Sequence, residues 1–518
     1  MSKTKKNKFT YRSIIVNRIL ATGISLILQI LWIAGSVMSL SEYSAWIDSG
    51  FRVISLIAVI YLVCKDDNPS YKICWIILIL ALPIFGGLLY LFAGNKKPSK
   101  RMHSKIENAH QRLIPELCGG DMSGKTDIPP RLMQTFSYVK GISGYPCYGN
   151  SDVKYYPVGE DMFKDILRET EKAEHYIFLE YFIINEGEMW DKLLKILIRK
   201  AEAGVEVRII YDDIGCIALL PPGYCRKLEK MHPNIKCLAF NPARPVLSLV
   251  MNNRDHRKIL VIDGHTAFSG GVNISDEYIN VTHPCGHWKD TGTMIKGRAA
   301  MNFCEMFLEM WHAFRDTEAK FSLADYEAEE YPPAAPEKGI VQPFYDTPLD
   351  REALSENLYI DILNAAEKYV YIYTPYLILD DNMKNALTLA AKRGVDVRLV
   401  TPGIPDKKAI YRLTRANYKP LLSAGVRIFE YAPGFIHAKS FVSDDRIAVV
   451  GTINLDYRSL FLHFECGTLF SDCKAVADLR ADCEDTFVKC REITGDNIRQ
   501  YFRGTMFDAF FRLLAPLL

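Results

Sequence analysis

The sequence predicts an α/β protein with two pseudo-symmetric halves, each a mixed sheet flanked by helices, behind an amino-terminal region of transmembrane helices. Two observations lead to this prediction. The first hundred residues hold long apolar runs, and the rest repeats the order strand, helix, glycine, strand. Such a repeat is typical of βαβ units. With 518 residues, the chain is long enough for two or three domains with their own cores.

The amino-terminal hundred residues are predicted to anchor the protein in a membrane. Apolar spans lie near residues 19–40, 45–64 and 73–93, and about 20 apolar residues suffice to cross a bilayer. Pro83 lies inside the last span, which membrane helices tolerate. Basic residues flank the region on both sides, so two crossings fit the charges better than three. We expect a multi-pass protein of the cell membrane with its catalytic part on the cytoplasmic side.

The remainder is expected to divide at changes of composition. Residues 101–150 connect the anchor to a first half at 151–325. A proline-rich linker follows at 326–345, and the second half covers 346–518 with an apolar carboxy-terminal segment.

Each half contains a recognisable copy of the repeat. The predicted strand, helix and second strand lie at 174–178, 190–203 and 204–210 in the first copy, and at 367–371, 382–393 and 394–400 in the second. The matching order predicts the same supersecondary unit in both halves.

Composition argues against several classes of function. A net charge of +2 disfavours a nucleic-acid binder. The 13 cysteines include no CxxC pair, so neither a zinc site nor a redox motif is indicated. A metal cluster of His283, Cys285 and His287 would lack a fourth ligand, and His463 is expected in an ordinary turn or surface role. We therefore expect no metal and no cofactor.

One motif occurs twice, at corresponding places in the two halves. The pattern is HxKx₄Dx₆GxxN, without insertions in either copy. Its members are His256, Lys258, Asp263, Gly270 and Asn273 in the first half, and His437, Lys439, Asp444, Gly451 and Asn454 in the second. A single copy would be weak evidence, but two copies in register with the repeat indicate a shared site.

These residue types suit a phosphodiester. Residues two apart in a strand face the same side, so the His and Lys of each copy are expected to enter one cleft. One imidazole can attack phosphorus while the other moves a proton. The lysines, together with Asn273 and Asn454 as ligands of the substrate phosphate, stabilise negative charge without a metal. The two aspartates complete the predicted catalytic motif, although a turn-holding role suits them better than substrate contact.

Asp290 and Glu465 are predicted to orient the histidines. Each follows the motif of its half at a comparable place. A carboxylate bonded to the far nitrogen of an imidazole fixes its tautomer and raises its basicity.

The duplicated motif resembles the HKD motif of the phospholipase D superfamily, over roughly residues 150–518. The chain is also similar to bacterial cardiolipin synthases in the segment from Asn68 to Gly86, in both HxK motifs and in its last seven residues. The resemblance implies transfer of a phosphatidyl group between two phosphatidylglycerol molecules in the bilayer, with release of glycerol. It also implies His256 as the nucleophile and His437 as the acid and base. Gly271 stands where the family commonly has serine, which would remove one hydroxyl contact to phosphate.

Other functions remain open from the sequence alone. A phospholipase D-type hydrolase, or another phosphatidyltransferase such as a phosphatidylserine synthase, would use the same motif. A nuclease fits the near-neutral charge poorly, and an inactive scaffold would be expected to have lost a His or Lys of the motif. The oligomeric state is not readable from the sequence.

Overall fold

The computed structural model divides into two compact units. The residues that it describes are 44–66, 68–94, 100–117, 120, 128–242, 253–315, 322–331 and 339–501, with a few positions near either end (27, 30, 31, 504, 505, 508, 511–513 and 515). The first unit comprises residues 1–99, 243–253 and 509–518, and the second comprises residues 100–242 and 254–508. The predicted span at 19–40 lies almost wholly outside the described residues.

Three helices form the described part of the first unit. They are α2 (Ser44–Cys64), α3 (Pro69–Ala81) and α4 (Pro83–Ala93). A small core of Leu62, Tyr71, Trp75 and Ile79 holds them together, and the Tyr71 hydroxyl donates to the Gly94 carbonyl at 2.9 Å.

The apolar span predicted at 73–93 is divided between two helices, α3 and α4. Leu82 separates α3 from α4, with extended rather than helical backbone angles. Pro83 explains the break, because proline has no N–H for the helix ladder and disfavours a helical conformation at the preceding residue. Within the described residues, no helix combines the length and the apolar character needed to cross a bilayer.

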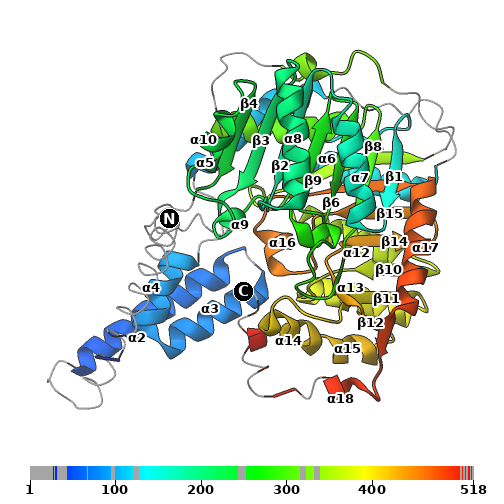
Figure 1. Cartoon of the computed structure of the whole chain (residues 1–518). Helices are drawn as coiled ribbons and strands as arrows, with labels where there is room; N and C mark the ends of the chain where they lie inside the picture. Colours follow the sequence, from blue (N-terminus) through cyan, green and yellow to red (C-terminus); the bar gives the residue numbers. More distant parts are fainter. Residues whose placement is uncertain are drawn as a thin grey trace. The chain divides into compact units, whose positions relative to one another are not determined.

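The first half of the second unit is built on a seven-stranded mixed sheet (Figure 1) with the order β1-β8-β6-β5-β2-β3-β4. Its strands are β1 (Asp152–Tyr156), β2 (Tyr176–Tyr181), β3 (Glu206–Asp212), β4 (Ile235–Phe240), β5 (Lys258–Ile262), β6 (Thr266–Gly270) and β8 (Gly292–Lys296). Strands β2, β3 and β4 are parallel. Helices α7 (Gly159–Thr170) and α8 (Glu188–Glu202) cross in front of the sheet in Figure 1.

The second half repeats this topology in an eight-stranded sheet with the order β17-β12-β11-β10-β14-β15-β16-β9. Its strands are β9 (Ile340–Asp346), β10 (Tyr369–Tyr373), β11 (Asp396–Pro402), β12 (Arg427–Tyr431), β14 (Ser440–Ser443), β15 (Ile447–Gly451), β16 (Glu465–Ser471) and β17 (Cys490–Ile493). Reversed, the order matches that of the first sheet strand for strand, with β17 as an extra edge. The predicted strand–helix–strand repeat is confirmed as β2–α8–β3 and β10–α13–β11, with α13 at Asp381–Lys392.

Further helices complete the two halves. They are α5 (Lys100–Leu113), α6 (Pro130–Ser143), α9 (Asp213–Cys216), α10 (Tyr224–Glu229), α11 (Ala300–Phe314), α12 (Leu354–Ala365), α14 (Lys408–Ala416), α15 (Tyr418–Ser423), α16 (Tyr457–Phe461), α17 (Lys474–Val488) and α18 (Ile498–Tyr501). Helices α5 and α6 lie in the stretch expected to be a connector, and β9 begins within the stretch expected to be a linker.

A small parallel sheet joins the halves. It pairs β7 (His287–Lys289) of the first half with β13 (Gly434–Ile436) of the second. Since His437 directly follows β13 and Asp290 directly follows β7, this pairing brings one motif histidine to a carboxylate of the other half.

Candidate active site

The two motif histidines lie just before their strands and are held by the opposite half. The backbone N–H of His256 donates to the Phe464 carbonyl at 2.9 Å, and that of His437 donates to the Lys289 carbonyl at 2.7 Å. Phe464 precedes Glu465, and Lys289 precedes Asp290. In both halves, therefore, the histidine is bonded to the residue directly before a carboxylate of the other half.

Those carboxylates accept from the histidine rings. Nδ1 of His256 lies 2.9 Å from both oxygens of Glu465, and Nδ1 of His437 lies 2.6 Å from Asp290 Oδ2. All four side chains are buried. A proton on Nδ1 shared with a carboxylate leaves the lone pair of a neutral ring on Nε2, the nitrogen suited to attack or to proton transfer. The structure thus brings together the four predicted residues, with each pair crossing between the halves.

Two buried lysines accompany the histidines. Lys258 Nζ donates to the His256 carbonyl at 2.5 Å, and Lys439 Nζ lies 2.8 Å from His437 Nδ1. Burial lowers the pKa of Lys258 to about 8 and that of Lys439 to about 7. An anionic ligand would therefore stabilise the protonated form of both lysines, because its charge would replace the hydration that they lose on burial.

The histidines are held in their neutral form. Burial, followed by the charge of Lys439, lowers the pKa of His437 to about 4, although Asp290 opposes this shift. Burial and the charges of Lys258 and other neighbours lower the pKa of His256 well below its ordinary value.

The two carboxylates differ from each other. Burial raises the pKa of Glu465 well above its ordinary value. Burial also acts to raise the pKa of Asp290, but Lys439 and His437 outweigh it and bring that pKa below its ordinary value. The pseudo-symmetric site is thus electrostatically asymmetric.

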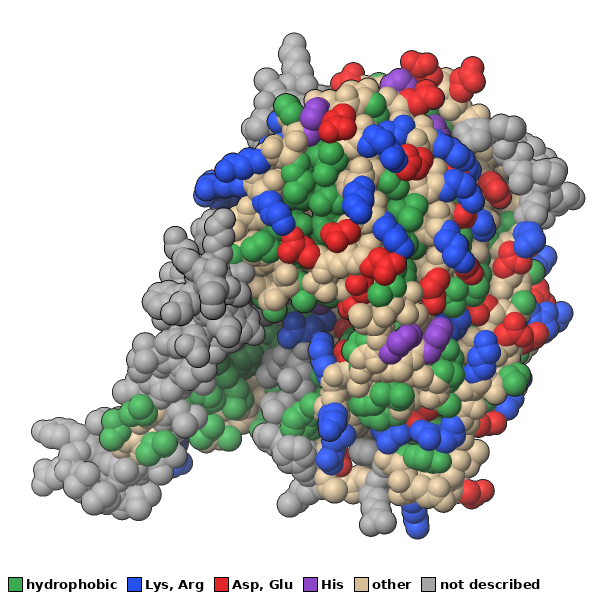
Figure 2. Space-filling view, in the orientation of Figure 1, with side chains coloured by type: hydrophobic (Ala, Val, Ile, Leu, Met, Phe, Trp, Pro, Cys, Tyr) green, Lys and Arg blue, Asp and Glu red, His purple; other side chains and the backbone are tan. Residues whose placement is uncertain are grey.

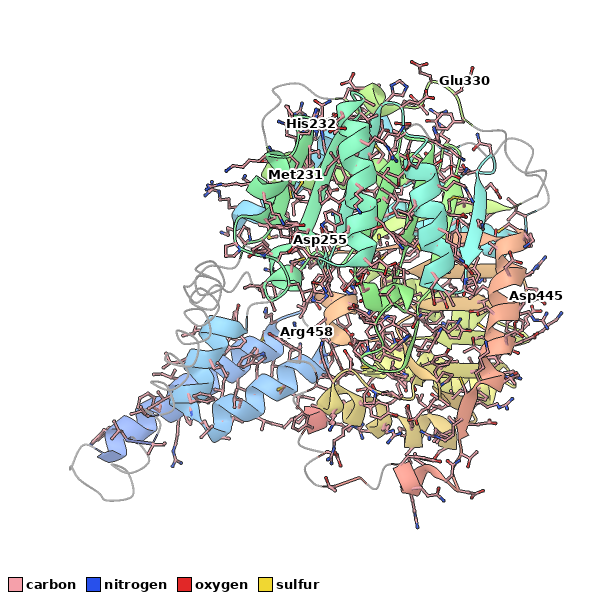
Figure 3. All side chains as sticks on the ribbon, viewed as in Figure 1. Met231, His232, Asp255, Glu330, Asp445 and Arg458 are labelled. Carbon is pink, nitrogen blue, oxygen red and sulfur yellow. The ribbon has the colours of Figure 1, made fainter. Side chains whose placement is uncertain are left out.

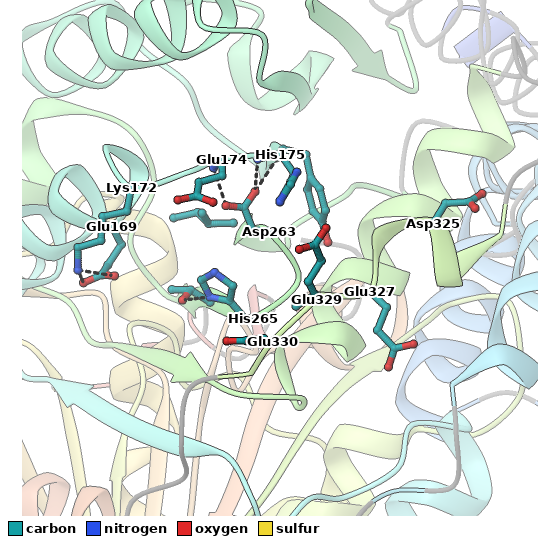
Figure 4. A pocket seen from close by; sticks show the side chains of 14 residues that line it. Glu169, Lys172, Glu174, His175, Asp263, His265, Asp325, Glu327, Glu329 and Glu330 are labelled. Atoms are coloured by element: carbon teal, nitrogen blue, oxygen red, sulfur yellow. Dashed lines mark hydrogen bonds and ion pairs between the residues drawn. The ribbon is translucent and has the colours of Figure 1, made fainter.

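The motif aspartates lie at the other end of their strands. Asp263 follows β5, which puts it roughly 16 Å along the strand from the histidine end. Its carboxylate accepts from the backbone N–H groups of Glu174, His175 and Tyr176 at 2.7–2.9 Å, beside an acidic pocket (Figure 4).

Asp444 makes the same three contacts in the second half. It accepts from the backbone N–H groups of Glu367, Lys368 and Tyr369 at 2.7–2.9 Å. We therefore correct the prediction that the two aspartates belong to the catalytic set. Each aspartate holds the backbone where the neighbouring strand begins, in keeping with the turn-holding role expected of them.

The predicted phosphate ligands are occupied within the protein. Asn273 accepts from the Ile183 N–H at 3.0 Å and donates to the Tyr278 hydroxyl at 2.7 Å. Asn454 is buried and hydrogen-bonds to the Asp456 carboxyl, which partly offsets the burial that raises the pKa of Asp456, while its Oδ1 has no hydrogen-bond partner among the described residues. These contacts position the loops that follow β6 and β15, and they leave the lysines as the principal cationic groups for a phosphate.

The difference between Gly271 and Thr452 has a structural cause. The Thr452 hydroxyl donates to Glu465 Oε2, so it supports a carboxylate rather than waiting for phosphate. At Gly271, an added Cβ would overlap Oδ1 of Asp290. The Asp290 carboxylate thus fills the space that a side chain at position 271 would occupy. The glycine makes room for this carboxylate, and the expected loss of a phosphate contact is not needed to explain it.

Several supporting residues escaped the sequence analysis. Arg257 is fully buried between the motif His and Lys and pairs with Glu180 at 2.6 Å and Asp255 at 3.1 Å. Figure 3 shows Asp255 in the first half and Arg458 on α16 in the second. The only sequence signal was Glu180, a charged residue inside the otherwise apolar strand β2.

A second missed contact ties the halves together. Lys289 Nζ pairs with Asp482 on α17 at 2.7 Å and donates to the Pro157 carbonyl at 2.9 Å. The hydroxyl of Tyr155 also donates to Asp482, at 2.8 Å. No sequence spacing relates these residues, because they come from three separate segments.

Comparison with known proteins agrees with this geometry. The model of the family described as "Cardiolipin synthase, PLD-like domain" matches residues 166–311 and 359–486. A second model, "Phospholipase_D-nuclease N-terminal", matches residues 53–95.

Relatives cover nearly the whole chain. A Streptococcus mutans protein of uncharacterised function is 42% identical over 89% of this chain and 99% of its own. Cardiolipin synthase of Geobacillus kaustophilus is 32% identical over 90% of this chain and 94% of its own, and cardiolipin synthase 2 of Bacillus cereus is 31% identical over 90% and 91%.

A solved structure shares the fold. Phosphatidylserine synthase of Haemophilus influenzae superposes with a TM-score of 0.56 at 16% identity, covering 74% of this chain and all of that one. The family model, the relatives and the duplicated motif agree, and the chain belongs to the cardiolipin synthase family of phospholipase D-like proteins.

Proposed function

We propose that this protein is a cardiolipin synthase, which transfers a phosphatidyl group from one phosphatidylglycerol to a second and releases glycerol. The observation that carries the proposal is the reciprocal pairing of His256 with Glu465 and of His437 with Asp290, beside two buried lysines. Relatives named cardiolipin synthase over most of the chain support the choice of substrate.

The first step forms a covalent intermediate. Nε2 of His256 attacks phosphorus, and the bond from phosphorus to the glycerol headgroup oxygen breaks. His437, protonated for this step, gives its proton to the departing oxygen. Phosphatidyl-histidine and free glycerol result.

The second step reverses the roles. A headgroup hydroxyl of another phosphatidylglycerol attacks phosphorus, His437 takes the proton from that hydroxyl, and the bond to His256 breaks. Cardiolipin leaves, and both histidines return to their starting state. Lys258 and Lys439 supply positive charge to the phosphoryl oxygens as negative charge grows on them.

The asymmetry of the carboxylates supports this assignment of roles. Asp290 keeps a lowered pKa beside His437, so its negative charge stabilises the imidazolium that an acid requires. An anionic phosphodiester would also raise the pKa of His437 from about 4 by offsetting the charge of Lys439. His256 needs its neutral form to attack, and its pKa lies well below the ordinary value.

The first unit is assigned to the cell membrane. Helix α2 exposes many large apolar side chains, including Trp46, Val53, Ile54, Leu56 and Ile57. Such a surface fits contact with lipid, and the match of the amino-terminal family model to residues 53–95 supports the assignment. We assign the second unit to the cytoplasmic side, because basic residues flank the apolar region.

A nucleic-acid substrate is disfavoured. On the face of the second unit seen in Figure 2, Lys and Arg side chains alternate with Asp and Glu side chains. A phosphate backbone would instead favour a continuous basic surface.

Product analysis tests the proposal. The full chain is incubated in mixed micelles with phosphatidylglycerol carrying a labelled headgroup, and lipids and free glycerol are quantified. Cardiolipin and glycerol in equal amounts support the synthase. Glycerol with phosphatidic acid would instead identify water as the acceptor, and phosphatidylserine formed only from added serine and a nucleotide-activated lipid would identify another transferase.

A further inference from the structure

His463 is a third histidine beside the nucleophile, and the proposed reaction does not use it. Its side chain is 10% exposed, and neither ring nitrogen has a hydrogen-bond partner among the described residues. Its Nδ1 lies 3.9 Å from Glu465 Oε1, and its ring centroid lies 5.7 Å from that of His256. A largely buried imidazole whose nitrogens have no partner destabilises the fold unless a ligand binds it.

We propose that His256, His463 and Glu465 form a binding site for a divalent transition-metal ion such as Zn²⁺, and that an ion bound there inhibits the enzyme. One donor atom of each residue lies within 4.8 Å of the other two. His256 Nδ1 is 2.9 Å from Glu465, and His463 Nδ1 is 3.9 Å from it. Ligand atoms around tetrahedral zinc lie roughly 3.3 Å apart, given bonds of about 2.0–2.1 Å.

The donor set favours zinc over calcium or magnesium. Two imidazoles and one carboxylate, with a fourth position open to water, are typical ligands of Zn²⁺. Burial, followed by the charges of Arg458, Arg254 and Lys258, lowers the pKa of His463 well below its ordinary value, and neutral imidazole is the form that ligates. The same charges weaken cation binding, so the ion is expected to be exchangeable.

The corresponding position beside His437, in the other pair, lacks such a site. Trp288 occupies the place of His463 in the other half, two residues before Asp290, with its ring centroid 5.6 Å from that of His437. An indole N–H is only a donor and cannot ligate a metal. The asymmetry therefore restricts the proposed site to the side of His256.

Inhibition follows from the tautomer of His256. An ion on Nδ1 takes the place of the proton shared with Glu465, and that proton moves to Nε2. Nε2 then has no lone pair with which to attack phosphorus. Because the ion binds on the far side of the ring from the lipid phosphate, extra substrate should not reverse the inhibition.

A second cluster provides a matched control. His110 on α5 lies 2.8 Å from Glu309 and 3.8 Å from Glu305 on α11. Glu305 also accepts from the Tyr145 hydroxyl. The ring of His110 is already bonded to a carboxylate, whereas neither nitrogen of His463 has a hydrogen-bond partner among the described residues, so the His110 cluster is expected to bind the ion more weakly than the site at His463.

The experiment measures metal binding and inhibition separately. Co²⁺ is titrated into the chelator-treated full chain, and the ligand-field absorption reports binding without any lipid. Zn²⁺ inhibition is measured in parallel, with each variant compared to its own rate in chelator. His463→Phe keeps the ring volume and removes both donors, and His110→Gln is the control.

We expect His463→Phe to lose one equivalent of Co²⁺ binding and to raise the inhibitory Zn²⁺ concentration at least about tenfold, whereas His110→Gln changes neither. Equal Co²⁺ spectra for wild type and His463→Phe, or loss of sensitivity only in His110→Gln, would overturn the proposal. Inhibition rests on the proposed function. The Co²⁺ titration does not, so a failure of the synthase assay with intact Co²⁺ binding would affect the function and not the site.

Discussion

Nδ1 of His256 lies 2.9 Å from both carboxylate oxygens of Glu465, a residue of the opposite half of the molecule. The same relationship links His437 to Asp290. Neither half can therefore orient its own histidine, because the carboxylate that bonds to each imidazole belongs to the other half. The duplication produces one site with two reciprocal pairs, rather than two sites.

Removing the charge of either carboxylate should slow catalysis. In Glu465→Gln and Asp290→Asn, the amide can present its N–H to Nδ1 and stabilise the wrong tautomer. We expect the initial rate of cardiolipin formation to fall by about 10²–10⁴-fold in each. Thr452→Val, which removes a hydrogen bond to Glu465 together with the hydroxyl's contacts to the Cys466 backbone, should cost about tenfold. Rates within a factor of about three of wild type in both amide variants would contradict the orienting role.

Activity should fall as the pH rises through the lysine pKa values. Lys439 and Lys258 have pKa values lowered to about 7 and about 8, and only their protonated forms stabilise the phosphate. The value of kcat/KM, which reports the free enzyme, should therefore decline on the alkaline side of neutrality. In the complex the anionic lipid raises both pKa values, so kcat should decline at higher pH. A kcat/KM that stays constant from about pH 6 to pH 9 would contradict this account.

Substitution by serine should have different effects at Gly271 and Thr452, the residues directly after the two motif glycines. Gly271→Ser puts a side chain where Oδ1 of Asp290 lies, so the carboxylate must move away from His437. We expect a loss of at least about 10²-fold in rate with little change in substrate affinity. Thr452→Ser keeps the hydroxyl beside Glu465 and should retain most activity. Equal rates for Gly271→Ser and wild type would show that Asp290 need not occupy its present place.

The motif aspartates should contribute more to the stability of the fold than to the chemical step. Asp263→Ala removes the acceptor of three backbone N–H groups, and the buried one, that of Tyr176, costs about 1–3 kcal/mol when left unpaired. We expect Asp263→Ala to lower the urea midpoint markedly, whereas His256→Ala should unfold near the wild-type midpoint although it is inactive. An Asp263→Ala protein of normal stability and no activity would return the residue to the catalytic set.

The sequence was sufficient for the repeated unit, and it named the two histidines, the two lysines and the two carboxylates that lie together in the structure. Strands β2, β3, β10 and β11 lie close to the predicted ranges, and β3 and β11 each begin two residues after a glycine, Gly204 and Gly394. The placement of Asp290 and Glu465 beside the histidines also agrees with the prediction. Spacing alone, however, could not show that each carboxylate serves the histidine of the other half, since this depends on the pairing of β7 with β13.

Other features depended on contacts that a sequence pattern does not record. The break at Leu82 depends on a single proline inside an apolar run that otherwise favours one helix. Asn273 seemed suited to a phosphate, yet its amide is taken by Ile183 and Tyr278. Glu465 lies two residues from His463 in the sequence, but the contact of His463 with the ring of His256 comes from the other half and no sequence pattern showed it.

The most direct test of the central claim is the location of the covalent intermediate. Wild type, His437→Ala and His256→Ala are incubated with phosphatidylglycerol and quenched under alkaline conditions, in which phosphohistidine survives, and peptides are sequenced by mass spectrometry. The account predicts a phosphatidyl adduct on His256 in wild type and none in His256→Ala. In His437→Ala the adduct should form more slowly, because the acid for the first step is missing, and should not pass to a second lipid at the wild-type rate. An adduct found only on His437, or undiminished cardiolipin formation in both variants, would contradict it.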